Sequence, residues 1–281
     1  MGSTLTGMSG SRDTAARTLR RWMAIGTVFA WSSQWSCRPA VAHDAPSDPG
    51  APRPPAAVAQ KNALQGNPSK IGFSKGKKQL RRMYHGVRHE TVYAGCRFRD
   101  WTLDWTGCCI ANRGHVRDRL EWEHVVPAAA FGRPLLVWQK GHAKCINSRG
   151  KAYRGRRCAK KTSERFRRME GDMHNLLPSI GRLNQARGHR AMGLITGERR
   201  PHGTCDVELD GPMIEPRPAV RGDIARAYLY MHKAYPGLGI VNEATRPMWS
   251  RWHAEDPPSA WEKKRNELIS AQQGNRNPYI Q

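Results

Sequence analysis

The chain has 281 residues, enough for one large domain or two small ones. It carries 47 Lys and Arg residues against 23 Asp and Glu residues, and this formal net charge of +24 exceeds what a merely solubilising surface needs. The candidate partners are therefore polyanions, namely nucleic acid, an anionic membrane or an acidic polysaccharide. The sequence has no CxxC pair, which argues against a structural zinc site, and neither a P-loop nor a GxGxxG fingerprint.

The N-terminus has the three parts of an export signal. A basic segment (17–21) precedes an uncharged, mostly apolar run (22–31), and Ala40-Val41-Ala42 supplies a small-x-small cleavage site. We therefore expect residues 1–42 to be a signal peptide and the mature chain to start at His43. The apolar run is too short to span a bilayer, although an uncleaved anchor and a twin-arginine export route are the alternatives.

Cleavage would also fix the cysteine count and the charge. Of seven cysteines, Cys37 would leave with the signal, and the loss of five Arg and one Asp lowers the net charge from +24 to +20. An even set in an exported protein predicts disulfides. The remaining six are Cys96, Cys108, Cys109, Cys145, Cys158 and Cys205.

A change of composition predicts where the folded domain begins. Residues 43–68 are mostly Pro, Ala, Gly, Asp and Ser, which bury too little apolar surface to offset the entropy of ordering. We expect a disordered linker over 43–75 and one domain over 76–281. Within that domain the pattern predicts a first helix over 79–84 and a strand over 92–98.

The central part of the domain predicts a strand, a loop and a helix. Residues 119–126 alternate in polarity and stop at a proline, which predicts a strand, and 139–160 have the composition of a long loop. Ser163 can cap a helix that carries His174 and Asn175 near its C-terminal end.

Two more helices follow, and together the elements define the fold class. Residues 222–235 place one apolar stripe on a helix that Asp223 can cap, and 258–272 repeat the helical spacing. Aromatic residues at such spacing are typical of a core rather than of base stacking. The expected class is α+β, with helices and short strands mixed.

Two short motifs carry the chemistry. Glu123 and His124 adjoin in the segment 120–127 (LEWEHVVP), and His174-Asn175 follow about fifty residues later in 173–178 (MHNLLP). A carboxylate and an amide can supply oxygen ligands to one divalent ion, and an imidazole can activate water. Hydrolysis of a phosphodiester with one metal ion needs these parts.

The flanking sequence resembles the bacterial endonuclease I family, whose members are periplasmic or secreted, sequence-nonspecific deoxyribonucleases, some of which also cut RNA. The resemblance runs in order over roughly residues 76–281. It is carried by 119–132 (RLEWEHVVPAAAFG), 155–178 (GRRCAKKTSERFRRMEGDMHNLLP), 220–231 (VRGDIARAYLYM) and 274–281 (GNRNPYIQ).

The resemblance implies a ββα-metal (His-Me finger) site and a role for four residues. Glu123 and Asn175 would bind one Mg²⁺, and His124 would be the general base that takes a proton from the attacking water. Arg156 would hold the scissile phosphate, which its guanidinium matches geometrically. No organic cofactor is implied.

Several neighbouring residues keep alternative roles at this point. Asn175 could instead cap its helix, and His174 is expected to be structural rather than a ligand. Asn184 and Arg187 match a family Asn-x-x-Arg and could support metal waters and phosphate or serve structure alone. Two acidic residues are expected to be surface or capping carboxylates. They are Glu170 and Asp172.

The cysteines depart from the family pattern in a consistent way. Many relatives begin the domain with Tyr-Cys-Gly-Cys, whereas residues 93–96 read YAGC, and the cysteine that often follows Asn-Pro-Tyr is absent as well. One whole bridge is therefore expected to be missing. We expect Cys145 to pair with Cys158, and Cys96 and Cys205 each to pair with one of the adjacent cysteines at 108 and 109.

The combined expectation is an exported, Mg²⁺-dependent, sequence-nonspecific endonuclease that cuts DNA, with RNA left open, and leaves 5′-phosphate ends. We expect it to be periplasmic or secreted, monomeric and free of the membrane after signal cleavage. The alternative from another class is a noncatalytic DNA- or polyanion-binding envelope protein, which shares the charge but does not need Glu123, His124 and Asn175. A phosphatase for small molecules would not need so basic a surface.

Overall fold

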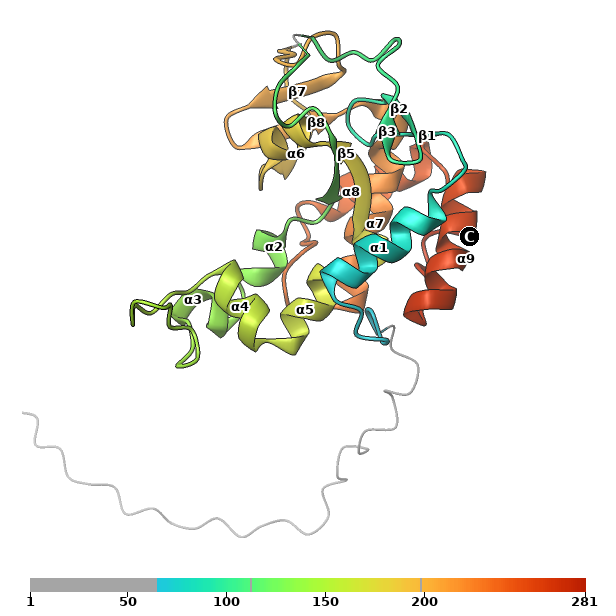
Figure 1. Cartoon of the computed structure of the whole chain (residues 1–281). Helices are drawn as coiled ribbons and strands as arrows, with labels where there is room; N and C mark the ends of the chain where they lie inside the picture. Colours follow the sequence, from blue (N-terminus) through green and yellow to red (C-terminus); the bar gives the residue numbers. More distant parts are fainter. Residues whose placement is uncertain (1–64, 112, 198) are drawn as a thin grey trace, which may run out of the picture. The chain divides into compact units, whose positions relative to one another are not determined.

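Helices and short strands are mixed along the chain, which confirms the α+β class (Figure 1). The computed structural model describes residues 65–281 except residues 112 and 198. The expected signal peptide with Cys37, and the linker up to residue 64, lie outside the described residues. The strands of the described part form two three-stranded sheets and one two-stranded ribbon. In this part no helix is long and apolar enough to cross a membrane.

The fold begins earlier than the composition predicts. Asn67 and Ile71 are buried, and the Asn67 side chain accepts a hydrogen bond from the Ile71 N–H (2.9 Å) and donates to the Ile71 carbonyl (2.8 Å). The first helix, α1 (Phe73–Met83), also starts six residues before the predicted 79. The linker expected over 43–75 is therefore too long at its C-terminal end, because a few buried groups order a segment whose composition is otherwise that of a linker.

A small antiparallel sheet follows α1. It contains β1 (His89–Glu90), β2 (Arg97–Arg99) and β3 (Thr102–Leu103). The strand predicted over 92–98 is wrong for most of its length, because the chain turns at 92–95 and Gly95 has a φ of +64°. This turn directs the Tyr93 side chain into the protein, where it is fully buried.

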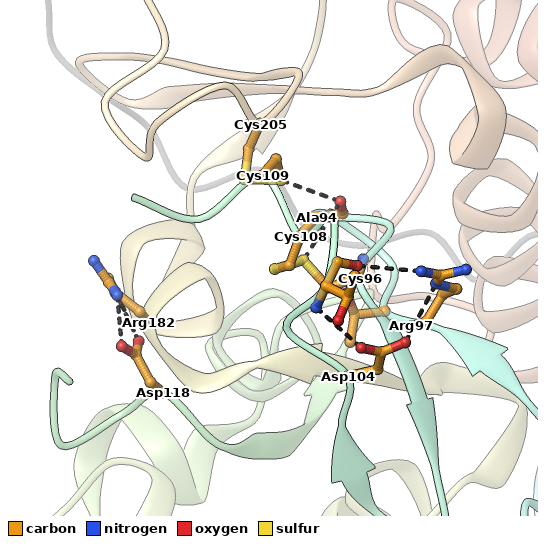
Figure 2. Close-up of a disulfide and its surroundings, with 11 residues drawn as sticks. Ala94, Cys96, Arg97, Asp104, Cys108, Cys109, Asp118, Arg182 and Cys205 are labelled. Carbon is orange, nitrogen blue, oxygen red and sulfur yellow. Dashed lines mark hydrogen bonds and ion pairs between the residues drawn. A yellow bond between two sulfur atoms is a disulfide. The ribbon is translucent and has the colours of Figure 1, made fainter. Parts of the chain in front are cut away.

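Three disulfides hold this region and the middle of the chain. They join Cys96 to Cys108, Cys109 to Cys205 and Cys145 to Cys158. Figure 2 shows the first two bridges next to each other, with the Arg182–Asp118 ion pair nearby. The expected pairings are confirmed, and the structure decides which of the adjacent cysteines takes which partner.

Two antiparallel strands form the centre of the site region. Strand β4 (Leu120–His124) lies within the predicted range and pairs with β5 (Leu176–Ile180), so that Glu123 faces Leu177 across the ribbon. The second strand was not predicted, because Pro178 indicates the end of an element. A two-stranded ribbon tolerates this proline, since a missing N–H matters little at a sheet edge.

Four short helices connect the two strands. They are α2 (Ala128–Gly132), α3 (Leu136–Lys140), α4 (Arg156–Thr162) and α5 (Glu164–Glu170). The Ser163 hydroxyl caps α5 as predicted, by accepting from the Phe166 N–H. The helix stops at Glu170, however, and a separate 3₁₀ turn, η1 (Met173–Asn175), carries the His-Asn pair. A side chain on Gly171 would lie 2.0 Å from the Ile71 carbonyl oxygen, so this close approach requires glycine.

The C-terminal half is mostly helical. Its elements are α6 (Gly181–Arg187), β6 (Ala191–Met192), β7 (Val207–Asp210), β8 (Met213–Pro216), η2 (Pro218–Val220), α7 (Arg221–Ala234), α8 (Arg246–Glu255) and α9 (Ala260–Gln273). Helices α7 and α9 confirm the two predicted helices, and the apolar stripe of α7 is buried in the core. Asp223 lies in the first turn of α7 rather than at its cap, whereas Ser259 and Glu262 form a capping box for α9.

Candidate active site

A cavity of about 670 Å³ opens where α1, β4, α6 and the start of α4 meet. Its walls bear the side chains of Glu123, His124, Arg156 and Asn184. Further cations surround them, which makes the cavity electrostatically suited to an anion. These cations are Lys77, Lys78, Arg81 and Arg119.

The carboxylate of Glu123 is buried and is held in place by two residues of the core. Its Oε1 accepts a hydrogen bond from the Tyr93 hydroxyl (2.8 Å) and lies 3.5 Å from the Arg187 Nε. Burial raises the pKa of Glu123 to about 7, and Arg187 opposes this shift. Both contacts use Oε1, so Oε2 is the oxygen that remains for a ligand in the cavity.

The imidazole of His124 has a defined tautomer. Its Nε2 lies 2.9 Å from the Glu170 carbonyl oxygen, which can only accept, so Nε2 must carry the hydrogen and Nδ1 must be the bare nitrogen. Burial lowers the pKa of His124 to about 4. The ring is therefore neutral at pH 7, with Nδ1 able to accept a proton.

Arg156 is the first residue of α4 and projects into the cavity with about half of its side chain exposed (48%). Its Nε and Nη2 both contact Oε1 of Glu170, at 3.0 and 2.9 Å, and Lys160 contacts the other carboxylate oxygen at 3.3 Å. Glu170 is buried, so it is not the surface carboxylate that was expected. It holds two cations with its side chain and orients His124 with its carbonyl.

The structure does not bring Asn175 to the cavity. Its side chain is fully buried, where Oδ1 accepts from the Val126 N–H (2.7 Å) and Nδ2 donates to the Val126 carbonyl (2.9 Å). The amide thus satisfies both backbone groups of Val126, just after β4. Its oxygen is used there and is not turned toward Glu123. The expected ligand role is corrected by this geometry, because a residue adjacent to a motif histidine can point away from the site.

A different amide lies in the cavity wall. Asn184, on α6, donates from Nδ2 to a carboxylate oxygen of Glu121 (3.3 Å), which leaves its Oδ1 as the available acceptor. Helix α6 can approach β4 closely because Gly181 has no side chain, whereas a Cβ there would lie 2.7 Å from the Glu121 Cδ. Arg187, one turn after Asn184, is fully buried behind Glu123 and not in the cavity.

The other polar residues of the motif serve the core. Asp172 is buried, accepts from both the Tyr230 and Tyr235 hydroxyls, and starts η1 by accepting from the His174 N–H. It is therefore a capping carboxylate, but not a surface one. His174 is buried too, and its Nε2 lies 3.0 Å from the Asn275 carbonyl, in line with the structural role expected.

The ligand set suits some cations better than others. Among the described residues, no group of three or more His, Cys, Asp or Glu side chains could hold a metal ion. This donor set differs from that of a typical zinc site. One carboxylate and one amide oxygen fit Mg²⁺, which keeps several of its water ligands.

Comparison with known proteins agrees with the family resemblance of the sequence motifs at this cavity. The family described as Endonuclease I matches residues 92–281, a range that contains every wall residue named above except those of α1. The chain belongs to the endonuclease I family. The family match begins after α1, although this helix packs against α5 and α9 as part of the same fold.

Individual relatives extend over most of the described chain. An extracellular deoxyribonuclease of Aeromonas hydrophila is 37% identical over 221 residues, which is 74% of this chain and 88% of the relative. A periplasmic deoxyribonuclease of the same species is 36% identical over 218 residues, 74% and 85% of the two chains. An endonuclease-1 of Buchnera aphidicola subsp. Acyrthosiphon pisum (strain APS) is 35% identical over 177 residues, 62% and 64% of the two chains.

Three residues of the candidate site were missed or undervalued from sequence. Tyr93 carries no signal, because nothing in a Tyr-Ala-Gly turn indicates a partner thirty residues away. Glu170 ends the segment 167–170 (RRME), whose charges are typical of a surface. Asn184 carries a usable signal, since Asn-x-x-Arg places both side chains on one side of a helix.

Proposed function

We propose that this protein is an exported, Mg²⁺-dependent endonuclease that hydrolyses phosphodiester bonds in DNA without sequence preference. The main support is one basic cavity that gathers a buried carboxylate, a neutral imidazole, an amide and a guanidinium: Glu123, His124, Asn184 and Arg156. The order of β4, β5 and α6 around it is the order of a ββα-metal site. Export is supported by the extracellular and periplasmic relatives and by the three disulfides.

Two residues would hold the metal ion. Glu123 would bind through Oε2 and Asn184 through Oδ1, and this pair replaces the Glu123–Asn175 pair expected from sequence. The positive charge of Mg²⁺ would favour ionised Glu123, whose pKa burial raises to about 7 although Arg187 opposes this shift. When bound, Mg²⁺ supplies charge stabilisation at the phosphate oxygens of the transition state.

His124 would act as the general base. Its Nδ1 is unprotonated at neutral pH because burial keeps the pKa of the ring low, and the Glu170 carbonyl fixes the ring through Nε2. Nδ1 can therefore take the proton of a water molecule that attacks phosphorus. A positioned base of this kind contributes roughly 10²–10⁴ in rate.

Arg156 would hold the scissile phosphate. Glu170 contacts its Nε and Nη2 and thus orients the guanidinium, while half of the side chain stays exposed to the cavity. Contacts to phosphate carry no sequence information, so cleavage should be nonspecific. We include RNA as a second substrate, because none of these groups needs to distinguish deoxyribose from ribose.

A plasmid-nicking assay tests the proposal. The full-length chain, exported and oxidised, should convert supercoiled plasmid to nicked and then linear DNA with Mg²⁺ and not with EDTA. Glu123→Gln and Asn184→Ala should both lose activity. Products that DNA ligase can rejoin without prior phosphorylation would support 5′-phosphate and 3′-hydroxyl ends, and a parallel assay on single-stranded RNA tests the second substrate.

The alternative of a noncatalytic DNA-binding protein gives a different result. Such a protein would retard DNA in a gel but leave plasmid intact with Mg²⁺, and Glu123→Gln would not change its affinity. That outcome would overturn the proposed function. The combination of a bare imidazole nitrogen and a buried carboxylate in one cavity favours catalysis, since binding alone requires neither.

A further inference from the structure

The segment between strand β4 and helix α5 carries an unusually high positive charge. No Asp or Glu occurs between His124 and Glu164, and residues 140–161 alone contain nine exposed Lys and Arg residues. They are Lys140, Lys144, Arg149, Lys151, Arg154, Arg156, Arg157, Lys160 and Lys161. We call residues 140–161 the basic hairpin. The chain runs from the end of α3, folds back on itself, and continues into α4.

The backbone of the basic hairpin is held in place at several points. The Cys145–Cys158 bridge closes it, the Tyr153 N–H donates to the Cys145 carbonyl (2.8 Å), and the Gly155 N–H donates to the Trp138 carbonyl (3.0 Å). At its tip, Oδ1 of Asn147 accepts from the N–H groups of Arg149 and Lys151, both at 2.9 Å. The backbone positions that carry the charges are therefore preorganised, which lowers the entropic cost of binding.

Most of these charges have no acidic partner in the described part of the chain. Arg156 and Lys160 share the carboxylate of Glu170, whereas the other seven cations lie within salt-bridge distance of no carboxylate among the residues that the structure describes. A surface of uncompensated charge attracts an anionic polymer strongly. It would also release counterions when a polyanion binds.

The basic hairpin is continuous with the active site. Arg156 begins α4 and lines the catalytic cavity, and the ammonium of Lys160, one turn later, lies 5.7 Å from the ring centre of Phe73 in the cavity wall. We propose that the basic hairpin is a second phosphate-binding surface, which holds the backbone of a polynucleotide where it leaves the cavity. This inference rests on the proposed function, because it takes the same substrate.

The chemistry of the hairpin favours a polynucleotide over an anionic membrane. Two exposed apolar side chains lie here, Ile146 within the hairpin at 50% and Leu136 on the preceding helix α3 at 68%. The tip itself, residues 147–151 (NSRGK), is polar throughout and offers no apolar face to insert into lipid. The hairpin is also continuous with a cavity that is suited to a phosphodiester. Nucleic acid is therefore the expected partner.

The test compares two triple variants with the same change of charge. Lys144→Gln/Arg149→Gln/Lys151→Gln removes three hairpin cations outside the cavity. Arg251→Gln/Lys263→Gln/Lys264→Gln removes three exposed cations from α8 and α9. Figure 1 shows α9 on the opposite side of the fold from α3 and α4.

Each triple variant is measured in two ways in the full-length protein. Affinity for a duplex of about 30 base pairs is measured in a His124→Ala background, at several salt concentrations. Hydrolysis of bis(p-nitrophenyl) phosphate is measured with His124 intact, because this small diester can occupy the cavity but cannot reach the three replaced cations, which lie outside it.

The hairpin variant should bind the duplex about 10-fold more weakly near 0.1 M salt, with a salt slope lower by up to about 2.7 if all three cations contact phosphates. The control variant should change affinity less than about 2-fold, and both should hydrolyse the small diester at the parental rate. Equal losses in the two variants, or an unchanged salt slope, would overturn the inference.

The same measurements separate the inference from two other outcomes, namely lipid binding by the hairpin and failure of the proposed function. Binding of the parent to phosphatidylglycerol vesicles that is lost in the hairpin variant, together with unchanged DNA affinity, would also overturn the inference and assign the surface to lipid. If the parent cuts neither plasmid nor small diester, the proposed function fails. The duplex-binding comparison still decides the role of the hairpin in that case.

Discussion

Replacing Asn175 by alanine should destabilise the fold without weakening metal binding. The side chain makes two buried hydrogen bonds, at 2.7 and 2.9 Å, to the N–H and carbonyl of Val126. Its removal leaves both backbone groups without a partner in a region closed to water, and each unsatisfied group costs about 1–3 kcal/mol. The free energy of unfolding should therefore fall by about 2–6 kcal/mol for the two groups together. Equilibrium unfolding in urea with the disulfides intact measures this change.

Asn184→Ala provides the matched comparison. Its side chain makes one partly exposed hydrogen bond of 3.3 Å, so the free energy of unfolding should change by less than about 1 kcal/mol. Titration calorimetry with Mg²⁺ should show a dissociation constant at least about 10-fold higher, since one of two protein ligands is lost. The Asn175→Ala protein should keep the parental Mg²⁺ affinity below its unfolding transition. Loss of Mg²⁺ affinity in Asn175→Ala with unchanged stability would refute the assignment.

Four further outcomes are expected. His124→Ala should keep DNA affinity and lose roughly 10²–10⁴ in turnover, so parental plasmid nicking would contradict the base role. Glu170→Gln should lower turnover about 10-fold in steady-state assays, because charge-assisted hydrogen bonds to the two cations are worth about 1.5–3 kcal/mol each; an unchanged rate would show that the cations orient themselves. Burial lowers the pKa of His174 to about 3, whereas the unfolded chain takes up this proton near pH 6.5, so stability should fall below pH 6.5 by up to about 1.4 kcal/mol per pH unit. Urea unfolding at pH 7 and pH 5 should show a smaller loss in His174→Asn than in the parent, and equal losses would count against this. Reduction of the Cys145–Cys158 bridge and its two companions should abolish activity, and full activity with six free thiols would disprove this.

The sequence predicted best where local rules act alone. The helix at 221–234 has an apolar stripe and ends before Pro236-Gly237, and both signals depend on neighbouring residues only. Strand β4 was found because its polarity alternates, and the adjacent Glu123 and His124 do line one cavity. Periodicity and adjacency thus located the strand that carries Glu123 and His124.

The sequence predicted poorly where distant segments decide the local structure. The helix expected to continue from Ser163 ends at Glu170, because Gly171 packs directly against the backbone at Ile71. Strand β5 passes through a proline that only the ribbon geometry makes tolerable. The direction of the Asn175 side chain depends on where Val126 lies, forty-nine residues earlier, and no local pattern encodes that distance.

Two of the disulfides protect the protein against the effect of a proteolytic cut. Proteases are a hazard that exported proteins meet. The basic hairpin offers exposed Arg149 and Lys151 to trypsin-like enzymes, yet both lie inside the loop closed by Cys145 and Cys158. The Cys109–Cys205 bridge, with a sequence separation of 96, encloses β4, α4, β5 and α6 in a second covalent ring. A single cut anywhere in that ring would leave the two fragments joined, with every residue of the chemistry still on one molecule.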